Sequence, residues 1–165
     1  MLTQANLKMI LHYDEETGNF HRKLRQKGIQ TVGEIAGTLT SYGYIRISLF
    51  SKQYMAHRLA YLYMEGELPN KYIQVDHIDR NRANNKWSNL RKATNMDNSY
   101  NTVMRKSNTS GVKGVSQHKT TKMFEAYLSA NGSKVYLGSY LTLEEATKAV
   151  RIAREELHGE FANHG

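Results

Sequence analysis

The chain has 165 residues, of which 39% are hydrophobic, and it contains no cysteine. The lack of cysteine excludes disulfide bonds and thiolate zinc sites, so a metal ion would have to be bound by histidine, carboxylate or amide groups. The formal net charge of +8 favours a polyanionic partner, which on charge alone could be DNA, RNA or an anionic membrane surface.

The first 70 residues predict a short helix, several strands and a second helix. Apolar residues at helical spacing in residues 7–11 indicate the first helix, and the polar turn 14–18 ends this pattern. Residues 43–49 alternate apolar and polar side chains, which predicts a half-buried strand. Residues 57–65 have the spacing of a helix, and Gly66 follows where a helix would end.

The next 30 residues predict a strand, a loop, a second strand and a helix, in that order. Residues 72–78 form the first strand and residues 81–85 an asparagine-rich loop. Residues 87–91 form the second, short piece. Thr94 is a suitable residue to cap the helix that follows.

Residues 102–110 predict a linker, because they are polar, basic and rich in Ser, Thr and Asn. A segment of this kind can lie along a phosphate backbone, and Arg105 and Lys106 are its basic residues.

The C-terminal segment predicts a three-stranded sheet covered by one helix. Residues 112–117, 124–130 and 134–140 have strand patterns, and the Asn-Gly pair before the third strand is a strong hairpin signal. Thr142 and its partner three residues later form a capping box at the start of the helix. The expected buried stripe of this helix consists of Ala146, Ala149, Val150, Ala153 and Leu157, and Gly159 is placed to end it.

The sequence has no features of a membrane protein or a signal peptide. It lacks a run of about 18 apolar residues, and its N-terminus is polar throughout. No strongly basic amphipathic helix with a large apolar face stands out, which disfavours a membrane surface as the partner. We therefore expect a soluble cytoplasmic protein that binds nucleic acid.

The pair Asp76-His77, at the end of the predicted strand 72–78, offers two chemical groups on opposite sides of the strand. Phosphodiester hydrolysis needs an attacking water, a base that deprotonates it, and positive charge at the phosphate and the leaving oxygen. One of the two groups can bind a metal ion while the other accepts the proton. An Asp-His pair by itself is common in proteins, so the residues that follow decide its meaning.

The segment 75–101, VDHIDRNRANNKWSNLRKATNMDNSYN, resembles the ββα-metal motif of HNH endonucleases over about 27 positions. The resemblance is closest to the phage-encoded and intron-encoded homing enzymes. It implies that His77 is the general base and that Asp76 and Asn98 bind one divalent cation. Many relatives have His at the third motif position, and the oxygen ligands here suit Mg²⁺ or Mn²⁺.

The same resemblance implies that Asn89 holds the loop between the strands and orients His77. Arg91 is expected either to contact the scissile or a neighbouring phosphate or to be a surface residue. Asp79, Asn84 and Asn85 are expected to build the loop rather than to bind the metal. For His57 we favour packing or a phosphate contact over catalysis.

The C-terminal segment resembles the ethylene-response-factor type of DNA-binding domain, on the residues GVKGVSQ, FEAYLSA, KVYLGSY and TLEEATKAVRIA. In that family the sheet lies in the major groove, so the face opposite the helix is expected to bind DNA. The family commonly has Arg and Trp at positions where this chain has Ser129 and Tyr136, so no base preference carries over. The expected DNA contacts, with the two basic linker residues, are Lys113, Gln117, Tyr127, Ser129, Lys134, Tyr136, Arg105 and Lys106.

Together these observations predict an α+β fold with two modules. An HNH domain is expected over residues 1–101, with its ββα-metal core at about 72–101. The basic linker 102–110 and a DNA-binding domain over residues 111–163 follow. In this second module an antiparallel three-stranded sheet is backed by one helix.

The leading hypothesis for function is a site-preferring, Mg²⁺- or Mn²⁺-dependent endonuclease that hydrolyses double-stranded DNA, with no small-molecule substrate. A non-cleaving DNA-binding regulator on an HNH scaffold and an RNA-binding or RNA-cleaving protein are the alternatives. If the protein is encoded by a phage, its location is the cytoplasm of the bacterial host. The oligomeric state stays open between a monomer and a homodimer.

Overall fold

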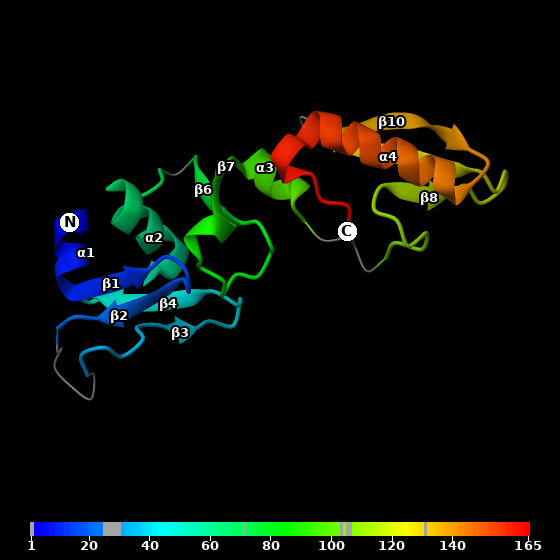
Figure 1. Cartoon of the computed structure of the whole chain (residues 1–165). Coiled ribbons are helices and arrows are strands. Elements are labelled where there is room, and N and C mark those ends of the chain that lie inside the picture. Colours follow the sequence, from blue (N-terminus) through cyan, green and yellow to red (C-terminus); the bar gives the residue numbers. More distant parts are fainter. Residues whose placement is uncertain (1, 25–30, 71, 103, 105–106, 131) are drawn as a thin grey trace. The chain divides into compact units, whose positions relative to one another are not determined.

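The computed structural model describes residues 2–24, 31–70, 72–102, 104, 107–130 and 132–165 (Figure 1). The chain forms two compact units, Met1–Thr94 and Asn95–Gly165. The first unit contains, in chain order, α1 (Gln4–Ile10), β1 (Leu11–Asp14), β2 (Asn19–Arg22), β3 (Thr38–Leu39), β4 (Ile45–Leu49), β5 (Lys52–Met55), α2 (Ala56–Glu65), β6 (Gln74–His77), the 3-10 turn η1 (Trp87–Asn89) and β7 (Leu90–Ala93). The second contains α3 (Asn95–Tyr100), β8 (Val115–Gln117), β9 (Phe124–Ala130), β10 (Ser133–Tyr140), α4 (Leu143–His158) and the 3-10 turn η2 (Gly159–Phe161).

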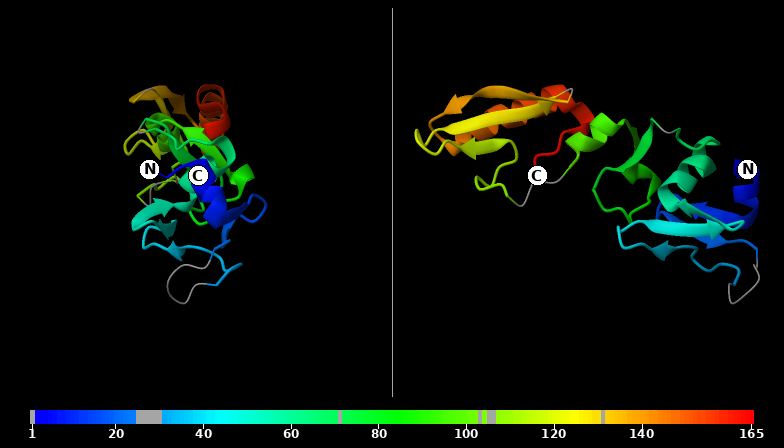
Figure 2. Two further views of the ribbon diagram at one scale, coloured as in Figure 1. Left: turned by 90° about the vertical axis from the view of Figure 1, so that its left-hand side faces the viewer. Right: turned by 180° about the vertical axis from the view of Figure 1, so that it is seen from behind.

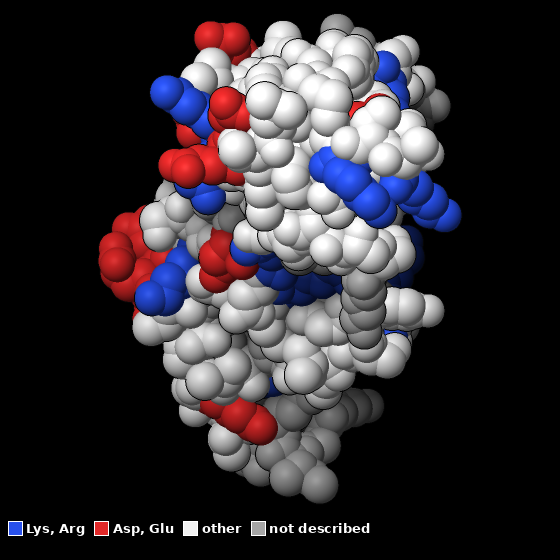
Figure 3. Space-filling view, turned by 90° about the vertical axis from the view of Figure 1, so that its right-hand side faces the viewer, with Lys and Arg blue, Asp and Glu red and all other residues white. Residues whose placement is uncertain are grey.

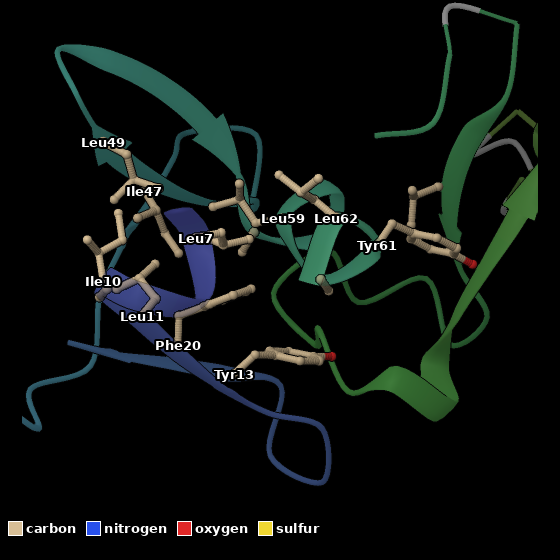
Figure 4. Close-up of a cluster of buried hydrophobic side chains, with 14 of the residues drawn as sticks. Leu7, Ile10, Leu11, Tyr13, Phe20, Ile47, Leu49, Leu59, Tyr61 and Leu62 are labelled. Atoms are coloured by element: carbon tan, nitrogen blue, oxygen red, sulfur yellow. The ribbon is translucent and has the colours of Figure 1, made fainter. Parts of the chain in front are cut away.

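The core of the first unit is built from α1, α2 and the strands that follow α1 (Figure 4). The side chains of β4 alternate as predicted, so that Ile47 and Leu49 are buried. Removal of these apolar side chains from water supplies most of the stability of such a unit. The labelled members of the core are Leu7, Ile10, Leu11, Tyr13, Phe20, Ile47, Leu49, Leu59, Tyr61 and Leu62.

Helix α2 connects this core to the ribbon of β6 and β7. It ends at Gly66, whose φ of +88° is the left-handed conformation that glycine adopts without strain. Ala56, Leu59 and Leu62 are buried on its inner side, and His57 is buried beside them at the start of the helix. The helix therefore carries a histidine in a place where apolar side chains usually lie.

Strands β6 and β7 pair antiparallel. The first strand is shorter than the predicted 72–78, and the predicted second piece, 87–91, begins as the 3-10 turn η1 before it becomes β7. The order of strand, loop, strand and helix is otherwise as predicted.

The second unit has a three-stranded antiparallel sheet in the order β10, β9, β8. Helix α4 packs against all three strands and lies along one face of the sheet (Figure 2). The predicted capping box is present, since the side chain of Thr142 accepts from the Glu145 N–H and the Glu145 carboxylate accepts from the Thr142 N–H. The helix ends before Gly159, as predicted.

The predicted buried stripe of α4 is wrong at its C-terminal end. Leu157 is 56% exposed, whereas Arg154 and His158 are buried. These positions continue the row of every fourth residue that begins at the buried Ala146. Arg154 donates to the Lys113 carbonyl at 2.8 Å and His158 Nε2 to the Ser129 carbonyl at 2.8 Å, because backbone carbonyls at the end of the sheet need donors there.

The fold is α+β, as predicted. The units divide before the predicted linker, because α3 packs with the second unit: the ring of Tyr100 stacks on His158 at 3.8 Å. The functional domain limits stay a prediction. Within the described residues, none of the helices is both long and apolar enough to span a bilayer.

Candidate active site

The ribbon of β6 and β7 places a carboxylate and an imidazole on opposite faces. In its register Asp76 lies opposite Arg91 and His77 opposite Leu90. His77 is only 4% exposed, and Asp76, on the other face, is partly exposed. The two chemical groups therefore work in different surroundings, as the alternation of a strand requires.

Asp76 is paired with a guanidinium group. Arg91 donates from Nε at 3.0 Å and from Nη2 at 2.8 Å, and both hydrogen bonds end on Asp76 Oδ2. The side chains of Arg91 and Asp76 are 10% and 12% exposed. A charged pair this well covered is screened by solvent much less than a surface pair.

The imidazole of His77 is oriented by Asn85, which is 2% exposed. His77 Nε2 lies 3.3 Å from Asn85 Oδ1, and the Asn85 Nδ2 donates to the Ala83 carbonyl, which fixes the orientation of the amide. An amide oxygen only accepts, so Nε2 carries the proton and Nδ1 is the basic nitrogen. Burial lowers the pKa of His77, although the hydrogen bond to Asn85 and the charges of Asp76 and Asp79 oppose the shift.

Asn89 makes hydrogen bonds within the loop between β6 and β7, whereas the hydrogen bond to His77 Nε2 is made by Asn85. Its Oδ1 accepts from the Asp79 N–H at 3.0 Å, and its Nδ2 donates to Asp79 Oδ1 at 2.9 Å and to the Asn84 carbonyl at 2.8 Å. Its own carbonyl accepts from the Ile78 N–H. In this geometry the predicted role of holding the loop belongs to Asn89, and the hydrogen bond that orients the imidazole comes from Asn85.

Asp79 is a structural acceptor in this loop. Burial raises the pKa of its carboxyl, but hydrogen bonds from Asn84, from the Asn81 N–H and from Asn89 outweigh this effect, so the pKa lies below its ordinary value. The carboxylate is therefore charged at neutral pH and accepts all three bonds. This agrees with the prediction that Asp79 and Asn84 build the loop.

The hairpin of β1 and β2 supports the same loop from behind. The Tyr13 hydroxyl donates to the Asn85 carbonyl at 2.6 Å, and the Trp87 N–H donates to the Glu15 carbonyl at 3.0 Å. At Gly18 an added Cβ would lie 2.3 Å from the Asn85 carbonyl carbon, so only glycine permits this close approach. Burial raises the pKa of Tyr13, which keeps its hydroxyl protonated as a donor.

His77 packs against two further rings. The centroid of His57 lies 5.1 Å and that of Tyr44 6.0 Å from the centroid of His77. Arg82 lies over the outer side of the Tyr44 ring, 4.9 Å from its centroid. Burial, with smaller contributions from His77 and Arg58, lowers the pKa of His57 to about 3, so His57 is neutral at physiological pH.

Comparison with known proteins places this site in a family. A model of the HNH endonuclease family matches residues 54–100, which include α2 and the whole ribbon. The chain is 41% identical over 97 residues to Protein 3.8 of Escherichia phage T7, and the match covers 59% of this chain and 78% of that protein. The chain belongs to the HNH endonuclease family. The predicted resemblance of residues 75–101 is thereby confirmed.

Two further likenesses are more limited. This HNH protein is 40% identical over 107 residues to the uncharacterized HNH endonuclease L560 of Acanthamoeba polyphaga mimivirus, a match over 64% of this chain that spans about half, 54%, of that relative. A solved structure of the HNH homing endonuclease I-HmuI, whose subject is DNA binding and cleavage by that enzyme, is also similar. The alignment covers 90% of this chain and 84% of the I-HmuI chain, with 21% sequence identity and a TM-score of 0.43.

The predicted metal ligands of the HNH motif are a carboxylate and an amide. Among the described residues, no group of three His, Asp or Glu side chains is placed to hold a metal ion. A carboxylate and an amide both offer oxygen donors, which are the ligands that a hard divalent cation takes. That Asp76 and Asn98 bind one such ion stays a prediction. Asp76 belongs to the first unit, and Asn98 lies in α3 of the second.

The second unit of the HNH protein has an aromatic and basic cluster on its open sheet face. In the register, Tyr136 lies opposite Tyr127 and Lys134 opposite Ser129. The rings of Tyr127 and Tyr136 are 5.2 Å apart, and Lys134 Nζ lies 3.4 Å from the centroid of Tyr127. Tyr136 is 55% exposed. These four residues are called the Tyr127 cluster below, and all of them were predicted as DNA contacts.

The other predicted DNA contacts differ in their surroundings. The ammonium group of Lys113 donates to the carbonyls of Tyr100, Thr102 and Asn163, so it is engaged inside the unit. Gln117 donates to the carbonyl of Lys122 at the end of its own hairpin.

Arg105 and Lys106, the predicted basic contacts of the linker, lie outside the described residues. On the face drawn in Figure 3, acidic and basic side chains both reach the surface between uncharged areas. The net charge of +8 therefore does not mark that face as the one that binds DNA.

A cavity of about 740 Å³ adjoins the Tyr127 cluster. Tyr127, Ser129 and Lys134 form part of its lining, together with Arg154 and His158 of α4. Its lining therefore combines hydroxyl, aromatic and cationic groups, which are the side chains that contact sugar and phosphate in protein complexes with DNA.

The contacts of His77 with Asn85, His57 and Tyr44 were not expected from the sequence. Asn85 was assigned to the loop and His57 to packing or a phosphate contact. The one local signal was the pair Asn84-Asn85, in which neighbouring amides point to different sides, one toward Asp79 and one toward His77.

Proposed function

We propose that this HNH protein is a site-preferring, metal-dependent endonuclease that hydrolyses phosphodiester bonds of double-stranded DNA. The observation that carries the proposal is the pair on β6: a buried neutral imidazole with its Nε2 on Asn85, and a carboxylate on the opposite face of the same ribbon. A general base must be unprotonated and correctly rotated at the working pH. The lowered pKa of His77 and the contact of its Nε2 with Asn85 support this role.

In the proposed mechanism His77 Nδ1 accepts a proton from the attacking water. Asn85 keeps the ring in the tautomer that this step requires, and the imidazolium formed is stabilised by the charges of Asp76 and Asp79. Asp76 and Asn98 would hold a Mg²⁺ or Mn²⁺ ion, which when bound stabilises the negative charge on the phosphate and the leaving oxygen. Arg91 is proposed to contact the same phosphate.

The second unit is proposed to bind DNA through its sheet, as an ethylene-response-factor type domain does. The Tyr127 cluster supports this role, because tyrosine rings and a lysine suit contacts to sugars, bases and phosphates. Lys113 is left out of the proposed contacts because its ammonium group already donates to three carbonyls. Loss of these sheet contacts is expected to weaken DNA binding and relax site choice.

The proposed setting is the cytoplasm of a bacterial host, which the likeness to a phage T7 protein supports. A monomer with one active site would nick one strand. Cleavage of both strands would need a homodimer or two successive attacks.

The test is a supercoiled-plasmid assay with Mg²⁺, Mn²⁺ or EDTA. We expect metal-dependent nicking that is abolished in His77→Ala, with DNA binding retained. The matched control is His12→Ala, which removes an exposed imidazole from β1 of the same unit and should leave nicking unchanged. Nicking by His77→Ala at the wild-type rate would refute the assignment of the base.

A non-cleaving DNA-binding regulator is the second candidate, and one observation favours it. The carboxylate proposed to bind metal is already paired with Arg91. DNA binding without cleavage in either metal, on plasmid and on a genomic DNA library alike, would select this candidate.

A further inference from the structure

The ion pair between Asp76 and Arg91 bears on how a metal ion would enter the site. The two residues are direct partners across β6 and β7, so the register of the ribbon delivers the guanidinium to the carboxylate. Two N–H groups of Arg91 donate to one oxygen, Oδ2, and both side chains are about nine-tenths covered. This pair gives Asp76 Oδ2 a cationic partner from within the protein.

A divalent cation and a guanidinium group compete for such a carboxylate. Both are positive, and at the separation that one carboxylate imposes they repel each other strongly where water is largely excluded. Arg91 must therefore leave Asp76, or yield part of its contact, for the ion to bind well. A DNA phosphate offers the guanidinium group another acceptor. Guanidinium binds a phosphate with two parallel hydrogen bonds, as it can bind a carboxylate.

We propose that Arg91 makes metal binding depend on DNA: it occupies Asp76 in the free protein and is drawn to a DNA phosphate in the complex. The inference rests on the proposed function, since it takes Asp76 as a metal ligand. The phosphate removes the competing charge from the carboxylate and adds an oxygen ligand for the ion. Metal and DNA then bind with positive coupling, and by thermodynamic linkage each strengthens the other by the same factor.

This coupling would restrain the nuclease. In the free protein the site holds little metal, so the activated water is formed chiefly when a phosphodiester is already in place.

The test measures Mn²⁺ binding directly, by the electron paramagnetic resonance signal of the free ion. All proteins carry His77→Ala, so that added duplex DNA is not cut. In the absence of DNA, Arg91→Gln is expected to bind Mn²⁺ roughly 5- to 150-fold more tightly than the parent, the range typical of coupled sites. Duplex DNA is expected to tighten Mn²⁺ binding in the parent and to do so far less in Arg91→Gln.

The matched control is Lys92→Gln. It removes the same charge one residue further along β7, where the side chain is exposed and paired with Glu65 instead of Asp76. Its Mn²⁺ affinity should equal that of the parent. Arg91→Lys keeps the charge but not the two-pronged contact and is expected to lie between parent and Arg91→Gln.

If Arg91→Gln is less stable than the parent, thermal melting with and without Mn²⁺ still tests the inference. Removing one partner of a covered pair leaves Asp76 without its cation, so Mn²⁺ should raise the melting temperature of Arg91→Gln more than that of the parent. Equal Mn²⁺ affinity and equal thermal shifts in both proteins would overturn the inference.

Two outcomes distinguish the competition at Asp76 from the metal site itself. If the parent binds Mn²⁺ without DNA as tightly as Arg91→Gln, the competition is absent but the metal site stands. If no variant binds Mn²⁺ even with DNA, the metal site at Asp76 fails and the inference fails with it.

Discussion

The rings of His57 and His77 lie 5.1 Å apart and meet at 85°, edge to face. The ring of His57 also lies 5.2 Å from the ring of Tyr44, so it packs against both rings. Its Nδ1 is buried and finds no hydrogen-bond partner among the described residues. A buried polar atom without a partner costs stability, which suggests that the ring is kept for its shape and its position beside His77.

Replacement of His57 separates shape from polarity. His57→Phe keeps a flat ring against His77 and should retain near-normal nicking. His57→Ala removes the ring and should lower kcat by roughly a hundredfold, because a displaced general base is ineffective. KM should change little in both. Steady-state nicking over a range of DNA concentrations measures kcat and KM, and equal losses of kcat in the two variants would show that ring packing is not what matters.

The low pKa of His57 makes the stability of the folded protein depend on pH. Burial holds the pKa of His57 at about 3 in the folded protein, against an ordinary value of 6.5. The unfolded chain therefore takes up a proton below pH 6.5 that the folded protein refuses, so the stabilising contribution is complete above pH 6.5 and is lost as the pH falls toward 3.

The slope for one proton is about 1.4 kcal/mol per pH unit. Urea unfolding at pH 7, 6, 5 and 4 should show the free energy of unfolding falling more steeply in wild type than in His57→Phe, by up to this slope. Parallel curves for the two proteins would contradict the assigned state of His57.

Asn85 predicts a change in the pH profile of cleavage. In wild type, burial lowers the pKa of His77, so the base stays neutral and active somewhat below pH 6.5. Asn85→Asp places a negative charge beside Nε2, which raises the pKa of His77 and should move the acidic limb of kcat to higher pH. Asn84→Asp is the matched control, because its amide contacts Asp79 instead. An equal shift in both variants would argue for a general charge effect.

Much of the fold follows from local patterns. The strand Phe124–Ala130 and the cap at Thr142 were predicted to the residue, because alternation and capping depend on neighbours in the sequence. The HNH motif was recognised for a similar reason, since its spacing is local to 27 residues.

The remaining features depend on distant contacts. Asn85 and Asn89 are both asparagines in one loop, and only the fold decides that Asn85 reaches His77 while Asn89 holds Asp79. The support from Tyr13 comes from 72 residues away in the sequence. Lys113 is similar: its sequence surroundings resemble those of a surface lysine, and the three carbonyls that it binds come from two separate segments, around residue 101 and at Asn163.

Tyr13 predicts that the first hairpin contributes to cleavage. Tyr13→Phe removes the hydroxyl that donates to the Asn85 carbonyl at 2.6 Å and leaves a buried acceptor unpaired, so the free energy of unfolding should fall by about 1–3 kcal/mol. Nicking at a temperature where the variant is folded should fall as well, because the loop that carries Asn85 loses a support. Tyr54→Phe, in β5 of the same unit, controls for the loss of a tyrosine hydroxyl. If Tyr13→Phe is destabilised but fully active, the hairpin contributes to stability alone.

The Tyr127 cluster predicts a salt-dependent contribution to DNA binding. Lys134→Gln removes a charge from the open sheet face, so affinity for duplex DNA should fall, and the slope of log K against log salt should decrease by about 1 if Lys134 contacts one phosphate. Tyr136→Ala should weaken binding with an unchanged slope, because the lost contact is uncharged. Lys148→Gln removes the same charge from the exposed side of α4, away from the sheet face that carries the cluster. If Lys148→Gln weakens binding as much as Lys134→Gln does, the sheet is not the DNA-binding face, and the helix side of the second unit must contact the duplex instead.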